Sequence, residues 1–182
     1  MKIRKIIREV FLKKRNPIRY ILERRIFPFI KNKDILYVGV AEYTKDYPKR
    51  LRNNNLITLD YNYKVKDYGA KEHFIEDITN KNITKIINNR FDIIFLIGIF
   101  GYGVDTELGM EKTLRNCYNL LKDNGIIIIE MSNKIRLRKL KTYNLFCEVE
   151  VFDMASTFLI EDRVFYFWMK KPFLNNEKEI LK

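Results

Sequence analysis

The sequence has few residues of the kinds that build metal centres or disulfide frameworks. It contains one histidine, His73, and two cysteines, Cys117 and Cys147. The cysteines form no C-x-x-C pair and have no metal-ligand spacing, so we expect reduced thiols buried in a helix and a strand, in a reducing compartment. A single histidine cannot build a histidine-rich metal site. We therefore predict no metal centre.

Long apolar runs are also missing. No run approaches the roughly 18–20 residues that a membrane-spanning helix needs. The N-terminus is charged throughout and lacks the uninterrupted apolar core of a secretory signal, so we expect a cytoplasmic protein without a transmembrane segment. Repeats, low-complexity tracts and Pro/Gly/Ser linkers are absent as well. A chain of 182 residues with 47% hydrophobic content is the size of one domain and can supply its core.

The charge of the chain is strongly basic, with a formal net charge of +12. Such a charge favours an anionic partner. The candidates are a phosphorylated or glycan substrate, a nucleic acid, and an anionic membrane surface. The chain is also rich in Lys, Asn and Ile together, which A+T-rich codon usage would produce without selection for binding. Both interpretations stay open.

Residues 1–30 form a basic amphipathic segment. Apolar residues recur at helical spacing from Ile3 to Phe11 and from Ile18 to Leu22, among many Lys and Arg residues. Pro17 separates the two stretches, so the pattern predicts two helices or one kinked helix. The apolar stripe either lies on an anionic membrane, covers an active site, or packs on the domain. We expect a domain over 31–172 and a polar tail over 173–182.

From Asp34 onward, short apolar runs alternate with helix-forming stretches. The runs, each ending at or next to a glycine or an acid, are 34–40, 56–60, 73–77, 91–97 and 125–130, and helical stretches cover 82–89 and 108–122. Continuous apolar runs suit strands buried on both faces of a parallel sheet. We predict a doubly wound α/β fold, a three-layer α/β/α sandwich. Two further runs, 145–152 and 163–170, lie too close for a crossover helix, so we expect them to pair as an antiparallel hairpin.

Ligands of open α/β sheets bind at the carboxyl ends of the strands. After the first run, glycine and alanine allow a cofactor to approach the backbone closely. An acid at the end of the second run can accept both hydroxyls of a ribose, and an acid after the third can accept a proton from an adenine amino group. The residues at these positions, and those of the turn after the fourth run, are Gly39, Val40, Ala41, Tyr43, Asp60, Tyr61, Asp77, Ile78, Gly98, Ile99 and Phe100.

Each acid has a second interpretation. Asp60 can cap the turn that follows its strand, and Asp77 with Thr79 can cap a helix. The occurrence of both at corresponding strand ends favours the adenosine interpretation. Ile78 would then pack on the adenine ring.

The order of strands, the two acids and the terminal hairpin resemble the class I S-adenosylmethionine-dependent methyltransferase superfamily over roughly Asp34 to Lys171. The segment 91–95 is similar to that family's fourth strand, and 120–125 to its turn into the fifth. The resemblance implies S-adenosylmethionine as cofactor, with the glycine loop at Gly39, the ribose at Asp60, adenine at Asp77, and the loop 98–100 beside the methyl group. The glycine loop is degenerate, because Ala41 and Tyr43 stand where glycines are usual; either Tyr43 borders the cofactor or cofactor binding is lost.

The methyl acceptor has no local motif. We expect a small molecule, a sugar or a lipid-linked glycan, with an RNA methyltransferase and a non-catalytic relative as alternatives. Candidate bases are Asp105 and Glu130, with Tyr102 as an orienting group; Glu130 can instead pair with Lys134 or Arg136. The basic stretch 134–141 could meet phosphates on the substrate.

Overall fold

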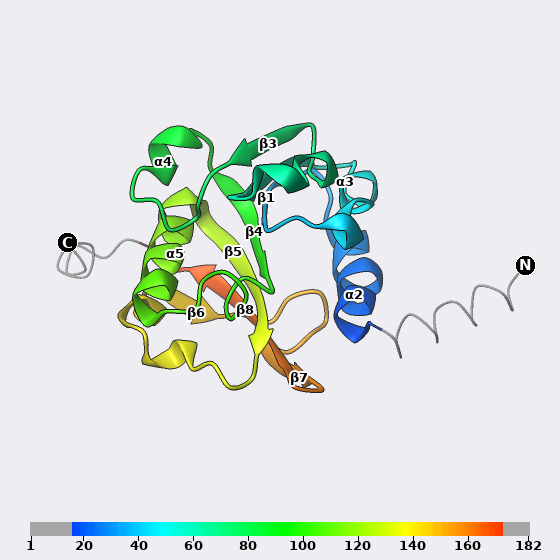
Figure 1. The fold of residues 1–182 in the computed structure, drawn as a ribbon. Helices are drawn as coiled ribbons and strands as arrows, with labels where there is room; N and C mark the ends of the chain where they lie inside the picture. The colour runs from blue at the N-terminus through cyan, green and yellow to red at the C-terminus, as the bar shows by residue number, and fades with distance from the viewer. Residues whose placement is uncertain (1–15, 173–182) are drawn as a thin grey trace, which may run out of the picture.

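Figure 1 shows the computed structural model, which describes residues 16–172. Within that range, eight strands form one sheet in the order β3-β2-β1-β4-β5-β8-β6, and β7 also pairs with β8. The strands are β1 Asp34–Val38, β2 Asn55–Asp60, β3 Glu72–Ile75, β4 Phe91–Ile97, β5 Leu121–Ser132, β6 Phe146–Glu148, β7 Thr157–Ile160 and β8 Arg163–Lys170.

The first five strands are parallel, as their continuous apolar runs predict. β1 pairs with both β2 and β4, and β4 with β5. β8 then runs antiparallel to β5, with Ile128 opposite Phe167. The doubly wound, mostly parallel α/β sheet is therefore confirmed, with antiparallel strands at its C-terminal end.

Helices and turns cover both faces of the sheet (Figure 1). They are α2 Pro17–Ile21, the π-helical turn η1 Leu22–Ile26, α3 Tyr47–Arg50, α4 Ile83–Ile86, α5 Glu107–Leu120, and the 3₁₀ turns η2 Phe27–Phe29, η3 Glu42–Thr44, η4 Tyr63–Tyr68, η5 Leu137–Lys139 and η6 Lys141–Leu145. Alternate strand residues face two separate clusters: Leu36 and Leu96 pack with α5, while Tyr37 and Phe95 pack with residues 22–30. This alternation is why the strands read as unbroken apolar runs.

The C-terminal hairpin differs from the sequence prediction. β6 pairs antiparallel with β8, as expected, but the strand joined to β8 by a tight turn is β7, which the prediction missed. β7 spans only four residues, and Glu161 in its turn has φ 57°. The predicted helix at 82–89 is shorter too, reduced to the single turn α4.

Residues 16–30 pack on the domain, which is one of the alternatives left open for the N-terminal segment. Their buried side chains join the cluster of Tyr37, Tyr47 and Phe95; these are Leu22, Ile26, Phe27 and Ile30. The predicted helix at Ile3–Phe11 lies outside the described residues, as does the tail 173–182. Over residues 16–172, no helix has the length and apolar character to cross a membrane.

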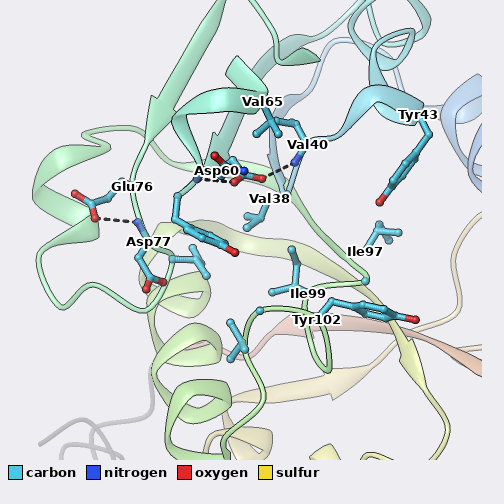
Figure 2. A pocket seen from close by; sticks show the side chains of 17 residues that line it. Val38, Val40, Tyr43, Asp60, Val65, Glu76, Asp77, Ile97, Ile99 and Tyr102 are labelled. Carbon is cyan, nitrogen blue, oxygen red and sulfur yellow. Dashed lines mark hydrogen bonds between the residues drawn. The ribbon is translucent and has the colours of Figure 1, made fainter. Parts of the chain in front are cut away.

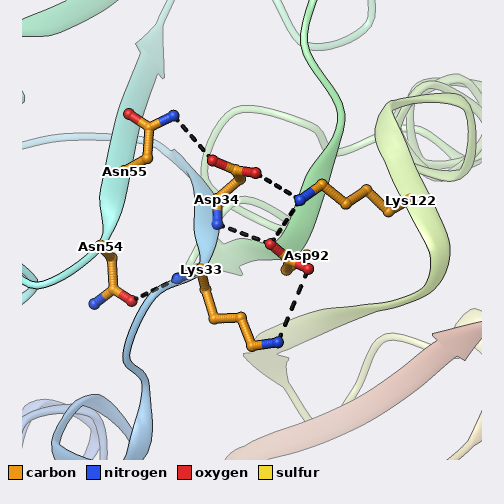
Figure 3. A network of polar contacts seen from close by, with 6 residues as sticks. All are labelled: Lys33, Asp34, Asn54, Asn55, Asp92 and Lys122. Carbon is orange, nitrogen blue, oxygen red and sulfur yellow. Dashed lines mark hydrogen bonds and ion pairs between the residues drawn. The ribbon is translucent and has the colours of Figure 1, made fainter.

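Two salt bridges tie the amino ends of the central strands together (Figure 3). The Lys122 Nζ lies 2.5 Å from Asp34 Oδ2 and 2.9 Å from Asp92 Oδ2. The backbone N–H of Asp34 also donates to Asp92 Oδ2 at 2.9 Å. The ion pairs thereby link β1, β4 and the start of β5 at the edge opposite to the carboxyl ends.

Candidate functional site

A cavity of about 460 Å³ lies at the carboxyl ends of β1, β2, β3 and β4. Its size falls in the ~300–1,000 Å³ range of small-molecule sites. Figure 2 shows Glu76 and Asp77 at one end of it and Tyr43 and Tyr102 at the other, with Asp60 between them. The position agrees with the rule that open α/β sheets bind ligands at this edge.

Gly39 forms the floor where β1 ends. Its φ is +82°, a conformation that side chains with a Cβ rarely adopt. A Cβ built there would lie 2.6 Å from Ile99 Cδ1, so the loops after β1 and β4 pack against each other through this missing side chain. The positive φ is therefore the main reason for a glycine here, the Ile99 side chain adds a contact that must shift, and the same bare backbone faces the cavity.

Asp60 is held in place by two backbone groups. Its Oδ2 accepts the N–H of Val40 at 2.9 Å, and its Oδ1 accepts the N–H of Asn62 at 2.8 Å. A carboxylate has about four acceptor positions, so each oxygen keeps a lone pair for a further donor. The turn-capping interpretation of Asp60 is thus correct for its local role, and the residue still lines the cavity.

Asp77 lies at the end of the cavity away from Tyr43 and Tyr102. Its Oδ1 accepts the N–H of Thr79 at 2.8 Å and so closes a turn, not a helix as the alternative interpretation held, because α4 begins only at Ile83. The same loop is anchored from α5, because Asn116 Nδ2 donates to the backbone oxygens of Ile78 at 2.6 Å and Asn80 at 3.0 Å. Ile78 is buried and contributes its side chain to the cavity wall.

Tyr43 borders the cavity at the end of the first loop. Thr44 caps this turn: its Oγ1 accepts the N–H of Ala41 at 3.0 Å and donates to the Ala41 oxygen at 2.8 Å. The pKa of the Tyr43 hydroxyl is raised by burial and by the carboxylates of Glu130 and Asp60. At neutral pH the hydroxyl therefore stays protonated and serves as a donor rather than as a base.

Tyr102 stands at the same end and contacts Arg163 from the start of β8. The guanidinium carbon of Arg163 lies 5.3 Å from the Tyr102 ring centroid, a cation–π distance. Arg163 also forms a salt bridge with the buried Glu130. Glu130 thus has an ion-pair partner, as the alternative interpretation held, but the partner is Arg163 rather than Lys134 or Arg136.

Most of the predicted site residues meet at this cavity, and four do not. Ala41 turns away into the capped turn with Thr44. Phe100 is fully buried in the core beside α5. Asp105 is exposed where the chain enters α5, and Glu130 is sequestered by Arg163. The structure therefore offers neither predicted base a place on the cavity wall.

Several lining residues were not predicted. They are Val38, Asn62, Val65, Glu76, Ile97, Gly103 and Val104. Glu76 precedes Asp77 in the same run, so the predicted position of Asp77 at the cavity could also have indicated Glu76. Asn62 and Val65 come from η4, a turn that has no apolar periodicity to mark it.

No protein-family model matches the sequence, and no curated protein does. Solved structures do match. A TehB-like S-adenosylmethionine-dependent methyltransferase from Corynebacterium glutamicum has TM-score 0.65 and 19% identity, covering 92% of this chain and 97% of its own. The N-methyltransferase NodS from Bradyrhizobium japonicum has TM-score 0.61 and 13% identity, covering 87% and 97%. TrmN from Thermus thermophilus has TM-score 0.63 and 13% identity, covering 84% of this chain but 48% of its own.

NodS has also been crystallised with S-adenosylhomocysteine, and that structure matches with TM-score 0.55, 14% identity and coverage of 89% and 88%. At these identities the likeness concerns the backbone. The chain has the fold of the class I S-adenosylmethionine-dependent methyltransferases.

Proposed function

We propose that this protein binds S-adenosylmethionine in the cavity at the carboxyl edge and transfers the methyl group to an acceptor. The proposal depends on one observation above all: Asp60 faces the cavity while two backbone N–H groups fix its carboxylate. Such an acid can accept the two ribose hydroxyls of an adenosine. Gly39 leaves the backbone open beside it, and Asp77 with Ile78 stands where the adenine would lie.

The chain's own contribution to the reaction is placement. The bound cofactor supplies a methyl group on a sulfonium, which is already electrophilic. Alignment of two reactants can contribute about 7–11 kcal/mol to such a transfer. Tyr43 and Tyr102, at the end of the cavity away from Asp77, would orient the acceptor and limit the access of water.

Melting with ligands tests the proposal. A ligand at about 100 times its dissociation constant stabilises the fold by about 2.7 kcal/mol, which raises the melting temperature of a domain of this size by roughly 5–10 °C. We expect that rise with S-adenosylmethionine and S-adenosylhomocysteine, and no rise with NAD. An unchanged melting temperature with both sulfur ligands would mean that the fold persists without cofactor binding, as in a non-catalytic relative.

For the acceptor, we favour a small molecule, a sugar or a lipid-linked glycan over RNA. The loop 98–106 is short, and the cavity has the volume of a small-molecule site. An RNA acceptor would bind through phosphates, so turnover would fall steeply as salt rises. Turnover that changes little between 50 and roughly 200 mM salt would favour the smaller acceptor.

A further inference from the structure

A second cavity, of about 370 Å³, opens between the loop after β5 and the β7–β8 hairpin. Its walls are mostly apolar, with Leu137 and Val164 buried and Tyr166 half-buried. Leu159 contributes a side chain that is 63% exposed. Exposed apolar surface around a cavity marks a place where a ligand can bury it.

The same cavity has a positively charged border. Between 133 and 145 the chain has no acidic residue and five basic ones, Lys134, Arg136, Arg138, Lys139 and Lys141. Of these, Arg136 and Arg138 line the cavity. Arg138 Nη2 is paired with Glu148 Oε1 at 2.6 Å, so its charge is partly compensated.

Arg136 carries the uncompensated charge. Its Nη1 donates to the backbone oxygen of Asn133, which orients the guanidinium without neutralising it. No ion pair to Arg136 occurs among residues 16–172. The cavity therefore combines one fixed cation with an apolar surface, a pattern that fits an amphipathic anion.

The two cavities are neighbours. A Cβ built on Gly101, in the loop that lines the first cavity, would lie 3.3 Å from Ile135, which precedes Arg136. Arg163, which contacts Tyr102 of the first cavity, precedes Val164 of the second. A molecule held in the second cavity would thus border the end of the first at Tyr102.

We propose, on the basis of the proposed methyl transfer, that the second cavity binds the methyl acceptor through a phosphate carried on an apolar chain. Arg136 would bind the phosphate, because a guanidinium presents parallel N–H donors to phosphate oxygens. Leu159 and Tyr166 would cover the chain. The group to be methylated would then extend from the phosphate toward Tyr102.

Farnesyl phosphate, measured by isothermal titration calorimetry below its micelle concentration, is the probe. Farnesol and inorganic phosphate are the half-ligand controls, and each should bind at least about tenfold more weakly than the intact probe, since each lacks one of the two contacts. Arg136→Gln should weaken farnesyl phosphate roughly 10- to 100-fold. Leu159→Ser, a substitution at an exposed position, should weaken it roughly five- to tenfold.

Lys139→Gln is the matched control, because Lys139 lies on the same loop, is exposed and does not line the cavity. It should change the affinity less than about twofold. Equal losses in Lys139→Gln and Arg136→Gln would overturn the proposal, because they would show attraction by overall charge. A further result would overturn the proposal in favour of RNA: a single-stranded oligonucleotide displaces the probe and also binds Arg136→Gln as weakly as farnesyl phosphate does.

The melting shift with S-adenosylhomocysteine, measured on the same proteins, separates the two proposals. A normal shift without farnesyl phosphate binding rejects the acceptor site alone. Probe binding that depends on Arg136 without any shift supports the anion site and rejects the proposed methyl transfer. In both Arg136→Gln and Leu159→Ser we expect the shift to be retained, which also shows that the variants are folded.

Discussion

The carboxylate of Asp60 accepts the backbone N–H of Val40 at 2.9 Å, so the end of β2 fixes the loop that follows β1. Gly39, next to Val40, donates its own N–H to the Leu59 oxygen at 2.8 Å. The loop is thus oriented by β2 on both sides of its glycine. This arrangement explains how a loop with one glycine can stay open: its shape is set by hydrogen bonds rather than by further glycines.

Asp60→Asn should remove the cofactor response. The amide replaces one acceptor oxygen by a donor that faces a backbone N–H, and it removes the charge. We expect the affinity for S-adenosylhomocysteine to fall at least about tenfold, with the melting shift lost at ligand concentrations that saturate the parent protein. The matched control is Asp67→Asn, an exposed carboxylate on η4, which should keep the full shift. A full shift in Asp60→Asn would remove this residue from the site.

Gly39→Ala should destabilise the fold, whereas Gly103→Ala should not. The first places a Cβ at φ +82° and 2.6 Å from Ile99; the second meets only Tyr61, at 3.8 Å. We expect the free energy of unfolding of Gly39→Ala to drop by about 1–3 kcal/mol. Urea denaturation measures both variants. Similar midpoints for the two would show that the Ile99 side chain can move aside and that the positive φ of Gly39 adds no strain.

Arg163→Met should be strongly destabilising, because it leaves the charge of Glu130 buried without its partner. Glu130 is 2% exposed. Loss of one member of a buried pair typically costs about 3–5 kcal/mol. The double variant Glu130→Gln with Arg163→Met should recover part of that loss, as urea denaturation of the four members of the cycle would show. If the double variant instead loses the sum of both single effects, the pair is not coupled.

Lys122→Met should flatten the acid dependence of stability. The Lys122 ammonium lowers the pKa of Asp34 through a hydrogen bond. Burial would raise the pKa of Asp92, but the Asp34 N–H and the Lys122 ammonium together lower it by more. Groups with a lowered folded pKa stabilise the fold above their unfolded pKa, and this stability is lost as pH falls, from about pH 5 downward. The urea midpoint of the parent protein should therefore drop more steeply below that pH than that of Lys122→Met.

The control for this comparison is Lys112→Met, at an exposed position of α5. It removes the same charge without touching the two carboxylates, so its acid limb should match that of the parent protein. Parallel acid limbs in all three proteins would contradict the assignment. The test concerns the slope with pH, since all three groups are partly exposed and their absolute contribution is screened.

The sheet was predictable because burial on both faces leaves a plain signal. Runs such as 91–97 and 125–130 have no polar alternation, and they form β4 and half of β5. β7 was not predicted because the strand has only four residues, of which three are half-buried and Leu159 is exposed. Its pairing with β8 comes from a tight turn whose residues include no glycine, with Glu161 at positive φ. That conformation cannot be inferred from an ordinary acidic residue.

The site was predictable to the extent that it depends on strand ends. Asp60 and Asp77 follow apolar runs, and the edge at which parallel strands end brings them to one cavity. The direction of a side chain within a loop has no such rule. Phe100 turns inward because the backbone bridges to Val104, and Glu130 is sequestered because a residue 33 positions later reaches it. Both outcomes depend on contacts between distant segments.

The reversed direction of β8 has a consequence for how the protein is made. A strand that runs against its neighbours brings its first residue, not its last, to the edge where the others end, and in β8 that residue is Arg163. Arg163, which neutralises Glu130, is therefore synthesised 33 residues after it. A nascent chain that stops short of β8 would hold Glu130 as an unpaired acid, so this ion pair can form only after the start of β8 has been synthesised.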